Sequence, residues 1–152
     1  MNRLLFQNTE TAAYATLLFV ELSPAGGRIR YANCGHVPAF LLRADGALER
    51  FPPTGTVLGA FENWNCAIGE TPFGTGDVLA LCTDGITEAA DQNGIEFGDE
   101  GLANALRCSS RQAPAQDLVR SITPEVLRFS GHEQHDDITL IVARSIDKAG
   151  RN

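Results

Sequence analysis

Two apolar segments that lie far apart in the chain each adjoin acidic residues. Residues 78–82 are almost entirely apolar and lead into Asp84, and residues 138–143 directly follow Asp136 and Asp137. The first segment is typical of a central strand that is covered on both faces. If the two strands are neighbours in a sheet, their acids meet at one rim, and oxygen ligands on a rigid scaffold suit a hard divalent cation.

The order of the expected elements indicates the fold class. Most strands come first, helices follow, and one strand returns near the end. We expect strands at residues 15–22, 28–34, 39–43, 47–51, 64–70, 78–82 and 138–143, and helical segments at residues 86–90, at residues 100–107 and from residue 114 onward. Pro124 should kink or divide the last helix. This order predicts an α+β protein in which helices flank an antiparallel β-sandwich.

Length and composition predict one soluble domain. The chain has 152 residues, of which 43% are hydrophobic and 20% are charged. We expect a single domain over residues 1–146 and a disordered tail over residues 147–152. The net charge of −7 argues against a nucleic-acid partner and against an anionic membrane surface.

The sequence also favours a cytoplasmic location. No apolar run approaches the length of a membrane span, and polar residues follow Met1 too soon for a signal peptide. The four cysteines include no C-x-x-C pair, which argues against a zinc knuckle. Cys34 and Cys82 stand in apolar, strand-like contexts and are expected to be buried free thiols.

Asp84 is the first candidate metal ligand. An Asp-Gly pair after a strand is often only a turn, but here the strand is a rigid platform. Gly85 would let the backbone pass close to an ion, so it joins the candidate site. Glu88 follows four residues after Asp84 and faces the same way if residues 86–90 are helical.

Asp136 and Asp137 are the second pair of candidates. Adjacent residues of a strand point to opposite faces, so only one of them can share a site with Asp84. A solvated acidic loop is the alternative interpretation. Two like charges at the start of an apolar strand are costly without a cation or hydrogen-bond donors, which favours the metal site.

Other polar residues allow further interpretations. His36 lies between two expected strands, either as a packed turn residue or as a residue that lines the site. His132, His135 and Asp136 could instead bind a transition metal in a zinc-dependent hydrolase, although a further ligand cluster is missing. Asp77 stands in a Gly-Asp turn before a strand and is interpreted as structural.

Taken together, the motifs resemble the metal-dependent serine/threonine protein phosphatases of the PPM (type 2C) class, in the bacterial branch typified by sporulation and stress-response phosphatases. The matching segments are residues 16–19 (TLLF), 31–38 (YANCGHVP), 76–79 (GDVL), 83–89 (TDGITEA), 96–98 (EFG) and 136–140 (DDITL). They follow the family's order over nearly the whole chain.

The resemblance implies a two-metal centre. In that family two Mn²⁺ or Mg²⁺ ions are held by carboxylates at the edge of a β-sandwich, and a water between them attacks phosphorus. By position, Asp84 and Asp136 correspond to two of the metal ligands, and Asp137 takes the position after the second. His36 stands where many eukaryotic relatives have an acid linked to a third metal. The implied substrate is a phosphoprotein, in bacteria often an anti-sigma-factor antagonist.

One departure from the family pattern is expected to matter. Members of the family have a Gly-Asp segment that supplies a bridging aspartate, followed by a segment that supplies another ligand. This chain has no counterpart of either segment, because Glu10 is the only acid in residues 1–15. The resemblance therefore covers the C-terminal part of such a domain, incomplete at the N-terminus. We expect weak or absent metal binding, little or no activity, and a homodimer through exposed sheet edges. A non-catalytic interaction or regulatory domain with the same fold is the alternative.

Overall fold

The structure is a computed structural model that describes residues 1–9, 13–23, 27–108, 113–131, 133 and 136–147. The chain divides into two compact units. One consists of Met1–Pro38 and Phe51–Phe73, and the other of Ala39–Arg50 and Gly74–Asn152. The expected disordered tail, residues 147–152, lies outside the described residues except for Asp147. His132 and His135 also lie outside them.

The first unit contains a three-stranded antiparallel sheet in the order β1-β2-β5. Its elements are α1 (Asn2–Asn8), β1 (Leu17–Leu22), β2 (Gly27–Cys34) and β5 (Gly69–Phe73). The strands β1 and β2 form an antiparallel hairpin and lie close to the ranges expected from the sequence, residues 15–22 and 28–34. Buried Ile29 and Asn33 of β2 belong to its interior, and Tyr31 stacks on Phe51 with ring centroids 4.3 Å apart.

Two features of this unit differ from the prediction. The helix α1 was not expected; its Asn2 side chain donates to the Phe61 carbonyl and accepts from the Gly59 amide, which ties the helix to that loop. The fifth strand was expected at residues 64–70 but runs over Gly69–Phe73. The amide of Ala67 donates to Thr54 O in the preceding loop. This part of the predicted strand therefore hydrogen-bonds to a loop and not to the sheet.

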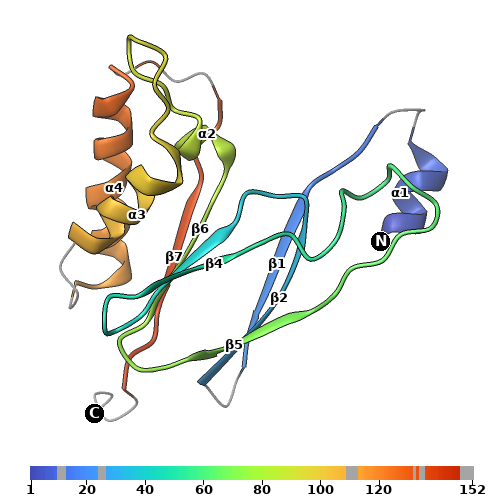
Figure 1. The fold of residues 1–152 in the computed structure, drawn as a ribbon, viewed down its shortest axis with the longest axis horizontal. Coiled ribbons are helices and arrows are strands. Elements are labelled where there is room, and N and C mark those ends of the chain that lie inside the picture. The colour runs from blue at the N-terminus through green and yellow to red at the C-terminus, as the bar shows by residue number, and fades with distance from the viewer. Residues whose placement is uncertain (10–12, 24–26, 109–112, 132, 134–135, 148–152) are drawn as a thin grey trace. The chain divides into compact units, whose positions relative to one another are not determined.

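The second unit contains a four-stranded sheet in the order β4-β3-β6-β7. Its elements are β3 (Ala39–Leu42), β4 (Leu48–Phe51, whose last residue falls in the first unit), β6 (Val78–Cys82), α2 (Asp84–Thr87), α3 (Gly98–Cys108), α4 (Ala115–Phe129) and β7 (Leu140–Arg144). Figure 1 shows α3 and α4 side by side next to this sheet, and α4 contacts β7 while α3 contacts β3. Together the two antiparallel sheets and their helices confirm the α+β class.

The core of the second unit explains why its elements form where they do. Fully buried side chains come from two strands and from all three helices: Phe40, Leu41, Leu79, Ile86, Leu102, Leu106, Ile122 and Val126. The strand β6 lies between β3 and β7, as expected for an apolar run. Pro124 does not divide α4, which runs without interruption from Ala115 to Phe129, and a kink at this proline remains a prediction. None of the helices in the described part of the chain has the length and apolarity needed to cross a bilayer.

Candidate metal-binding site

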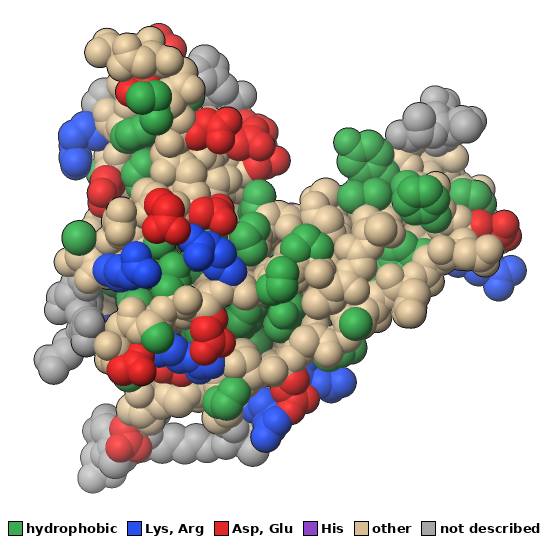
Figure 2. All heavy atoms as spheres, viewed as in Figure 1, with side chains coloured by type: hydrophobic (Ala, Val, Ile, Leu, Met, Phe, Trp, Pro, Cys, Tyr) green, Lys and Arg blue, Asp and Glu red, His purple; other side chains and the backbone are tan. Residues whose placement is uncertain are grey.

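Pairing of β6 with β7 brings the two acidic segments to one end of the second sheet. The strands are antiparallel, and Cys82 lies opposite Leu140, so the chain after Cys82 adjoins the chain before Leu140. This confirms the neighbouring arrangement on which the predicted site depended. Acidic side chains, drawn in red, gather over α2 in the space-filling view (Figure 2).

Thr83 joins the two segments. Its amide donates to Thr139 O over 3.1 Å, and its hydroxyl donates to Asp137 O over 2.7 Å. The same hydroxyl oxygen accepts a hydrogen bond from the Thr139 amide at 3.0 Å. Because a side-chain oxygen takes the place of a backbone acceptor here, the ladder ends and β7 begins at Leu140, two residues later than predicted.

Gly85 permits the close contact between the segments. A Cβ built on Gly85 would lie 2.6 Å from Asp137 O and 3.3 Å from the carbonyl carbon of Asp136. Real Cβ atoms do not approach other atoms so closely, so a side chain here would force the segments apart. Glycine was expected to let the backbone pass close to an ion. The close approach in the structure is to the backbone carbonyl of Asp137, and an approach to an ion remains a prediction.

Asp84 and Asp136 are both exposed at this end of the sheet. Asp84 is the first residue of α2, and its Oδ1 accepts the Gly85 amide at 3.1 Å. Asp136 Oδ1 accepts the Asp137 amide at 2.7 Å. In each case the amide of the next residue donates to the carboxylate and helps to orient it.

Asp137 differs from what its position in a strand would predict. Neither Asp136 nor Asp137 lies in β7, so the argument that they point to opposite faces of a strand was wrong. Both are exposed, and the carbonyl oxygen of Asp137 is bound by Thr83. Asp137 therefore has an evident structural role through its backbone, and a ligand role for its carboxylate remains a prediction.

Glu88 lines the same cavity as Asp136. This cavity has a volume of about 180 Å³ and is lined by Gly85, Glu88, Ala89, Ser130, Glu133, Asp136 and Ile138. The amide of Glu88 donates to Asp84 O at 2.7 Å, so the helical turn that was expected at residues 86–90 begins earlier, at Asp84. Sequence reasoning missed Glu133 and Ser130. Their only signal was a polar loop just before Asp136.

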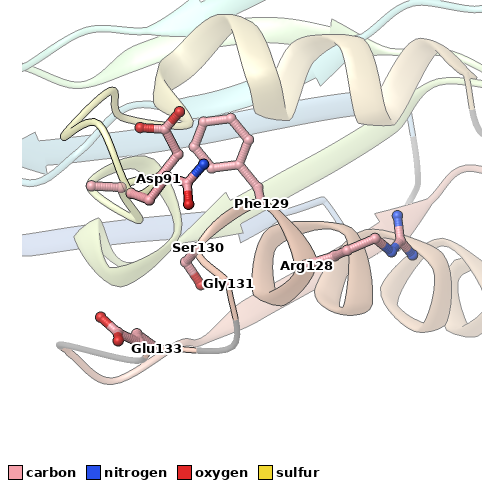
Figure 3. Close-up of a pocket in the computed structure, with 8 residues that line it drawn as sticks. Asp91, Arg128, Phe129, Ser130, Gly131 and Glu133 are labelled. Carbon is pink, nitrogen blue, oxygen red and sulfur yellow. The ribbon is translucent and has the colours of Figure 1, made fainter.

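A second, larger cavity adjoins the first. It has a volume of about 590 Å³ and shares Ser130 and Glu133 with the smaller one. Asp91 and Arg128 also line it, and Figure 3 shows the Arg128 side chain directed away from Asp91 and Glu133. Asp91 is engaged in its own turn, where its Oδ1 accepts the amides of Asn93 and Ile95 and holds the pKa of the carboxyl below its usual value.

The thiol nearest to this site is buried in the strand. Cys82 is the last residue of β6, and burial, with smaller effects from Asp99 and Asp84, raises its pKa to about 12. A thiol with such a pKa is protonated at neutral pH and is neither a nucleophile nor a ready metal ligand. Among the described residues at this end of the sheet, the side chains best suited to bind a metal ion are therefore carboxylates.

The donor chemistry suits Mn²⁺ or Mg²⁺, but the arrangement is incomplete. Carboxylate oxygens are the ligands that these hard ions prefer. Among the described residues, however, no three His, Cys, Asp or Glu side chains gather closely enough to hold one ion. Asp84, Glu88 and Asp136 could each supply an oxygen, without forming a complete ligand set.

His36 lies in the first unit, whereas Asp84 and Asp136 lie in the second. Its amide donates to the side chain of buried Asn33 at 2.9 Å, and its Nδ1 lies 3.1 Å from Val37 O. These contacts fix a turn after β2, and a role in lining the site remains a prediction.

Asp77, at the opposite end of β6, has the structural role that the sequence indicated. Its carboxylate is buried, accepts from Arg43 Nη1 at 2.8 Å, and binds the amides of Ala44 and Gly74.

Comparisons with known proteins agree on one family. The family model described as stage II sporulation protein E (SpoIIE) matches residues 1–145. Phosphoserine phosphatase RsbU of Bacillus subtilis (strain 168) is 30% identical over 147 residues, which make up 95% of this chain and 43% of RsbU. The chain thus spans less than half the length of this relative.

Solved structures share the fold. The phosphatase domain of the cell fate determinant SpoIIE from Bacillus subtilis, presoaked with Mn, superposes with a TM-score of 0.73 at 20% identity, over 97% of this chain and 63% of that chain. The catalytic domain of the serine threonine protein phosphatase PstP, in complex with two manganese ions, gives a TM-score of 0.70 at 20% identity, over 96% of this chain and 67% of that chain.

Proposed function

Because the chain belongs to the family of stage II sporulation protein E, we propose that it serves the metal-dependent hydrolysis of phosphoserine or phosphothreonine on a partner protein in bacterial signalling. The similarity to a protein named phosphoserine phosphatase supports this reaction class. The observation that carries the proposal is the junction of β6 and β7, where Thr83 and Gly85 hold the Asp84 and Asp136 segments together.

The chain's own residues would prepare the site for the ions. Asp84 and Asp136 are the proposed ligands of Mn²⁺ or Mg²⁺, with Asp137 and Glu88 as further candidates. When bound, such ions supply an activated water and neutralise charge on the phosphoryl group. Thr83 fixes the distance between the two segments through its hydrogen bonds to Asp137 O and to the Thr139 amide. No general acid is assigned.

Low activity of this chain by itself is part of the proposal. Affinity for a divalent cation rises with the number and charge of its ligands. The described residues offer separate carboxylates and no cluster of three ligand side chains, which favours weak binding. The same observation favours the alternative function, a non-catalytic interaction or regulatory domain that has the phosphatase fold.

The proposed partners follow from the reaction class. The substrate would be a phosphoprotein, by family resemblance an anti-sigma-factor antagonist. The net charge of −7 favours neither nucleic acid nor an anionic membrane surface as a partner. All four cysteines are free thiols, which supports a reducing, cytoplasmic setting. Two copies of the chain are also proposed to associate through exposed sheet edges.

Binding of Mn²⁺ tests the site directly. We would titrate the chain with Mn²⁺ and follow the free ion by electron paramagnetic resonance. Asp84→Asn and Asp136→Asn keep the side-chain shape and remove the charge, and each should weaken binding by about tenfold. Asp117→Asn, on the exposed side of α4, is the matched control and should bind as the original chain does. Equal Mn²⁺ affinity in all four proteins would contradict the site.

Hydrolysis of a phosphoserine peptide then separates the two functions. Mn²⁺-dependent release of phosphate that is lost in Asp84→Asn would establish the enzyme. It would also mean that the separate carboxylates suffice, against the expectation of a weak or inactive chain. Peptide binding without phosphate release, at saturating Mn²⁺, would favour the non-catalytic alternative for this chain.

A further inference from the structure

Two cysteine thiols meet in the first unit. The Sγ atoms of Cys34 and Cys66 lie 3.6 Å apart, although the residues are 32 positions apart in the chain. Both are free thiols; Cys34 is 2% exposed and Cys66 is half-buried. The sulfurs are in contact but not bonded, since a disulfide joins its sulfurs at about 2.05 Å. Two thiols in contact are the arrangement from which a disulfide can form.

Gly55 allows the two thiols to meet. It forms an isolated bridge with Cys34 on one side and with Cys66 on the other. Residues directly opposite each other in a ladder direct their side chains to the same face, so the two thiols flank a position that has no side chain. A Cβ built on Gly55 would lie 2.8 Å from Asn65 O and 3.0 Å from Cys66 Cβ. A side chain at residue 55 would therefore displace the Cys66 segment.

Thr54 holds the Cys66 segment against β2. Its hydroxyl oxygen lies 3.2 Å from Cys66 Sγ and accepts the Asn33 amide at 2.9 Å. Its carbonyl accepts the Ala67 amide at 3.0 Å, and its own amide donates to Asn33 O at 2.8 Å. Thr54 thus binds the chain neighbours of both cysteines. Two groups that the fold holds in contact react as if each were present to the other at very high concentration.

The two thiols differ in access and in acidity. Burial, with a smaller effect from the hydrogen bond to Cys66, raises the pKa of Cys34 to about 11. Cys34 is therefore protonated at neutral pH and shielded from solvent. Cys66 is more exposed and lies in the connection between β4 and β5. These differences favour Cys66 as the thiol that meets an oxidant first and Cys34 as the thiol that then reacts with it.

We propose that Cys34 and Cys66 form a site of reversible oxidation, at which hydrogen peroxide converts the two thiols into a disulfide. The disulfide ties the connection between β4 and β5 to the end of β2. A thiol reductant restores both thiols. The proposal depends neither on phosphatase activity nor on metal binding.

The reaction takes place in two steps. The Cys66 thiolate attacks one peroxide oxygen and the O–O bond breaks; the hydroxide that leaves takes up a proton, so Cys66 becomes a sulfenic acid and one water forms. The Cys34 sulfur then attacks the Cys66 sulfur and the S–O bond breaks. The hydroxide that leaves takes the Cys34 proton and forms a second water. The two sulfurs are oxidised, and the peroxide is reduced to water.

Formation of the bond requires a small movement. The sulfurs must approach each other by roughly 1.5 Å to reach the length of a disulfide. Cys34 is buried as the last residue of β2, whereas Cys66 belongs to a connection between strands. The movement is therefore expected on the Cys66 side.

Oxidation of the full chain followed by mass spectrometry tests the proposal. At low protein concentration, dilute hydrogen peroxide should lower the mass of the folded chain by about 2 Da, and a digest should contain a peptide pair linked through Cys34 and Cys66. Cys82 and Cys108 should remain reactive toward a thiol reagent after denaturation. Dithiothreitol should reverse the change. Recovery of Cys66 as sulfinic or sulfonic acid, without the link, would overturn the proposal.

Serine substitutions assign the reaction to this pair. Cys66→Ser removes one partner and should abolish the mass loss. Cys108→Ser is the matched control; it removes an exposed thiol of the second unit and should leave the mass loss unchanged. Circular dichroism of each variant verifies that it is folded. Equal yields of intramolecular disulfide in Cys66→Ser and in the original chain would contradict the assignment.

Unfolding tests whether the fold creates the preference for this pair. In urea the four thiols are no longer held at fixed positions. The same oxidation should then form several different disulfides, and the share of the link between Cys34 and Cys66 should fall by at least about threefold. An equal share in the folded and the unfolded chain would show that the contact in the fold is not responsible.

Gly55→Ala tests the geometry with all four thiols present. Its Cβ would displace Cys66, so the link should form at least about threefold more slowly than in the original chain. Circular dichroism again verifies the fold. An unchanged rate in the folded variant would contradict the approach of the thiols across Gly55.

Discussion

Gly85 determines how closely the two acidic segments approach each other. The space where a Cβ would project is occupied by Asp137 O, 2.6 Å away. The contact is with backbone, which cannot rotate aside as a side chain can. The position of Asp136 relative to Asp84 therefore depends on the absence of a side chain at residue 85.

Replacement of Gly85 by alanine should disturb both stability and metal binding. We expect Gly85→Ala to lower the free energy of unfolding by about 1–3 kcal/mol, the usual cost of forcing an extra methyl group into a packed site. Mn²⁺ affinity should fall with it. Gly74→Ala is the control, since the nearest atom to its added Cβ is Asp77 Oδ2 at 3.7 Å. Urea denaturation of both variants measures the difference, and equal stability would contradict this role for Gly85.

Asp77 and Asp84 mark the two ends of β6 but differ in environment. Asp77 is only 5% exposed and binds the Arg43 guanidinium and two backbone amides, whereas Asp84 is exposed. Removal of the Asp77 carboxylate would take a buried acceptor from two backbone amides and one of two carboxylate partners from Arg43, which also pairs with Glu49. This is costly, whereas loss of an exposed carboxylate is not.

Alanine substitutions should therefore separate a structural acid from a functional one. Asp77→Ala should lower the free energy of unfolding by about 3 kcal/mol. Asp84→Ala should change it by about 0.5 kcal/mol or less while weakening Mn²⁺ binding. Thermal and urea unfolding without metal measure the first effect. Similar destabilisation by the two substitutions would show that Asp84 is also structural.

At the scale of elements, sequence reasoning succeeded where one local pattern determines the structure. The apolar run Val78–Cys82 forms β6 with the predicted bounds, because turn residues limit it at both ends and neighbours cover both faces. The start of β7 was misplaced because the Thr83 hydroxyl, more than 50 residues away, replaces a ladder acceptor. Glu133 was missed for the same reason: only folding brings its loop to the cavity that Glu88 lines.

The helix α4 contains Pro124, which was expected to kink or divide it, and nevertheless runs as one helix. Pro124 lies inside Ala115–Phe129 and is exposed, so its ring meets solvent while Ile122 and Val126 anchor the buried face. Tertiary packing of an apolar face outweighs the missing amide of one residue. The helix is continuous, but the missing hydrogen bond at Pro124 lowers its stability.

Replacement of this proline should stabilise the protein. Pro124→Ala restores an amide donor and a good helix former, and we expect the free energy of unfolding to rise by roughly 1–2 kcal/mol. Pro114→Ala is the control. Pro114 is the N-cap of the same helix, where a missing amide costs little, and its replacement should change stability by less than about 0.5 kcal/mol. A decrease in stability for Pro124→Ala would mean that the proline supports the helix.

At the scale of the whole molecule, the family match concerns the fold, whereas the strand pairing concerns the position of individual acidic residues. The match over residues 1–145 establishes the fold family, and the structure brings Asp84 and Asp136 to one sheet end. The family match therefore indicates which reaction to test, and the junction of β6 and β7 indicates the residues at which to test it.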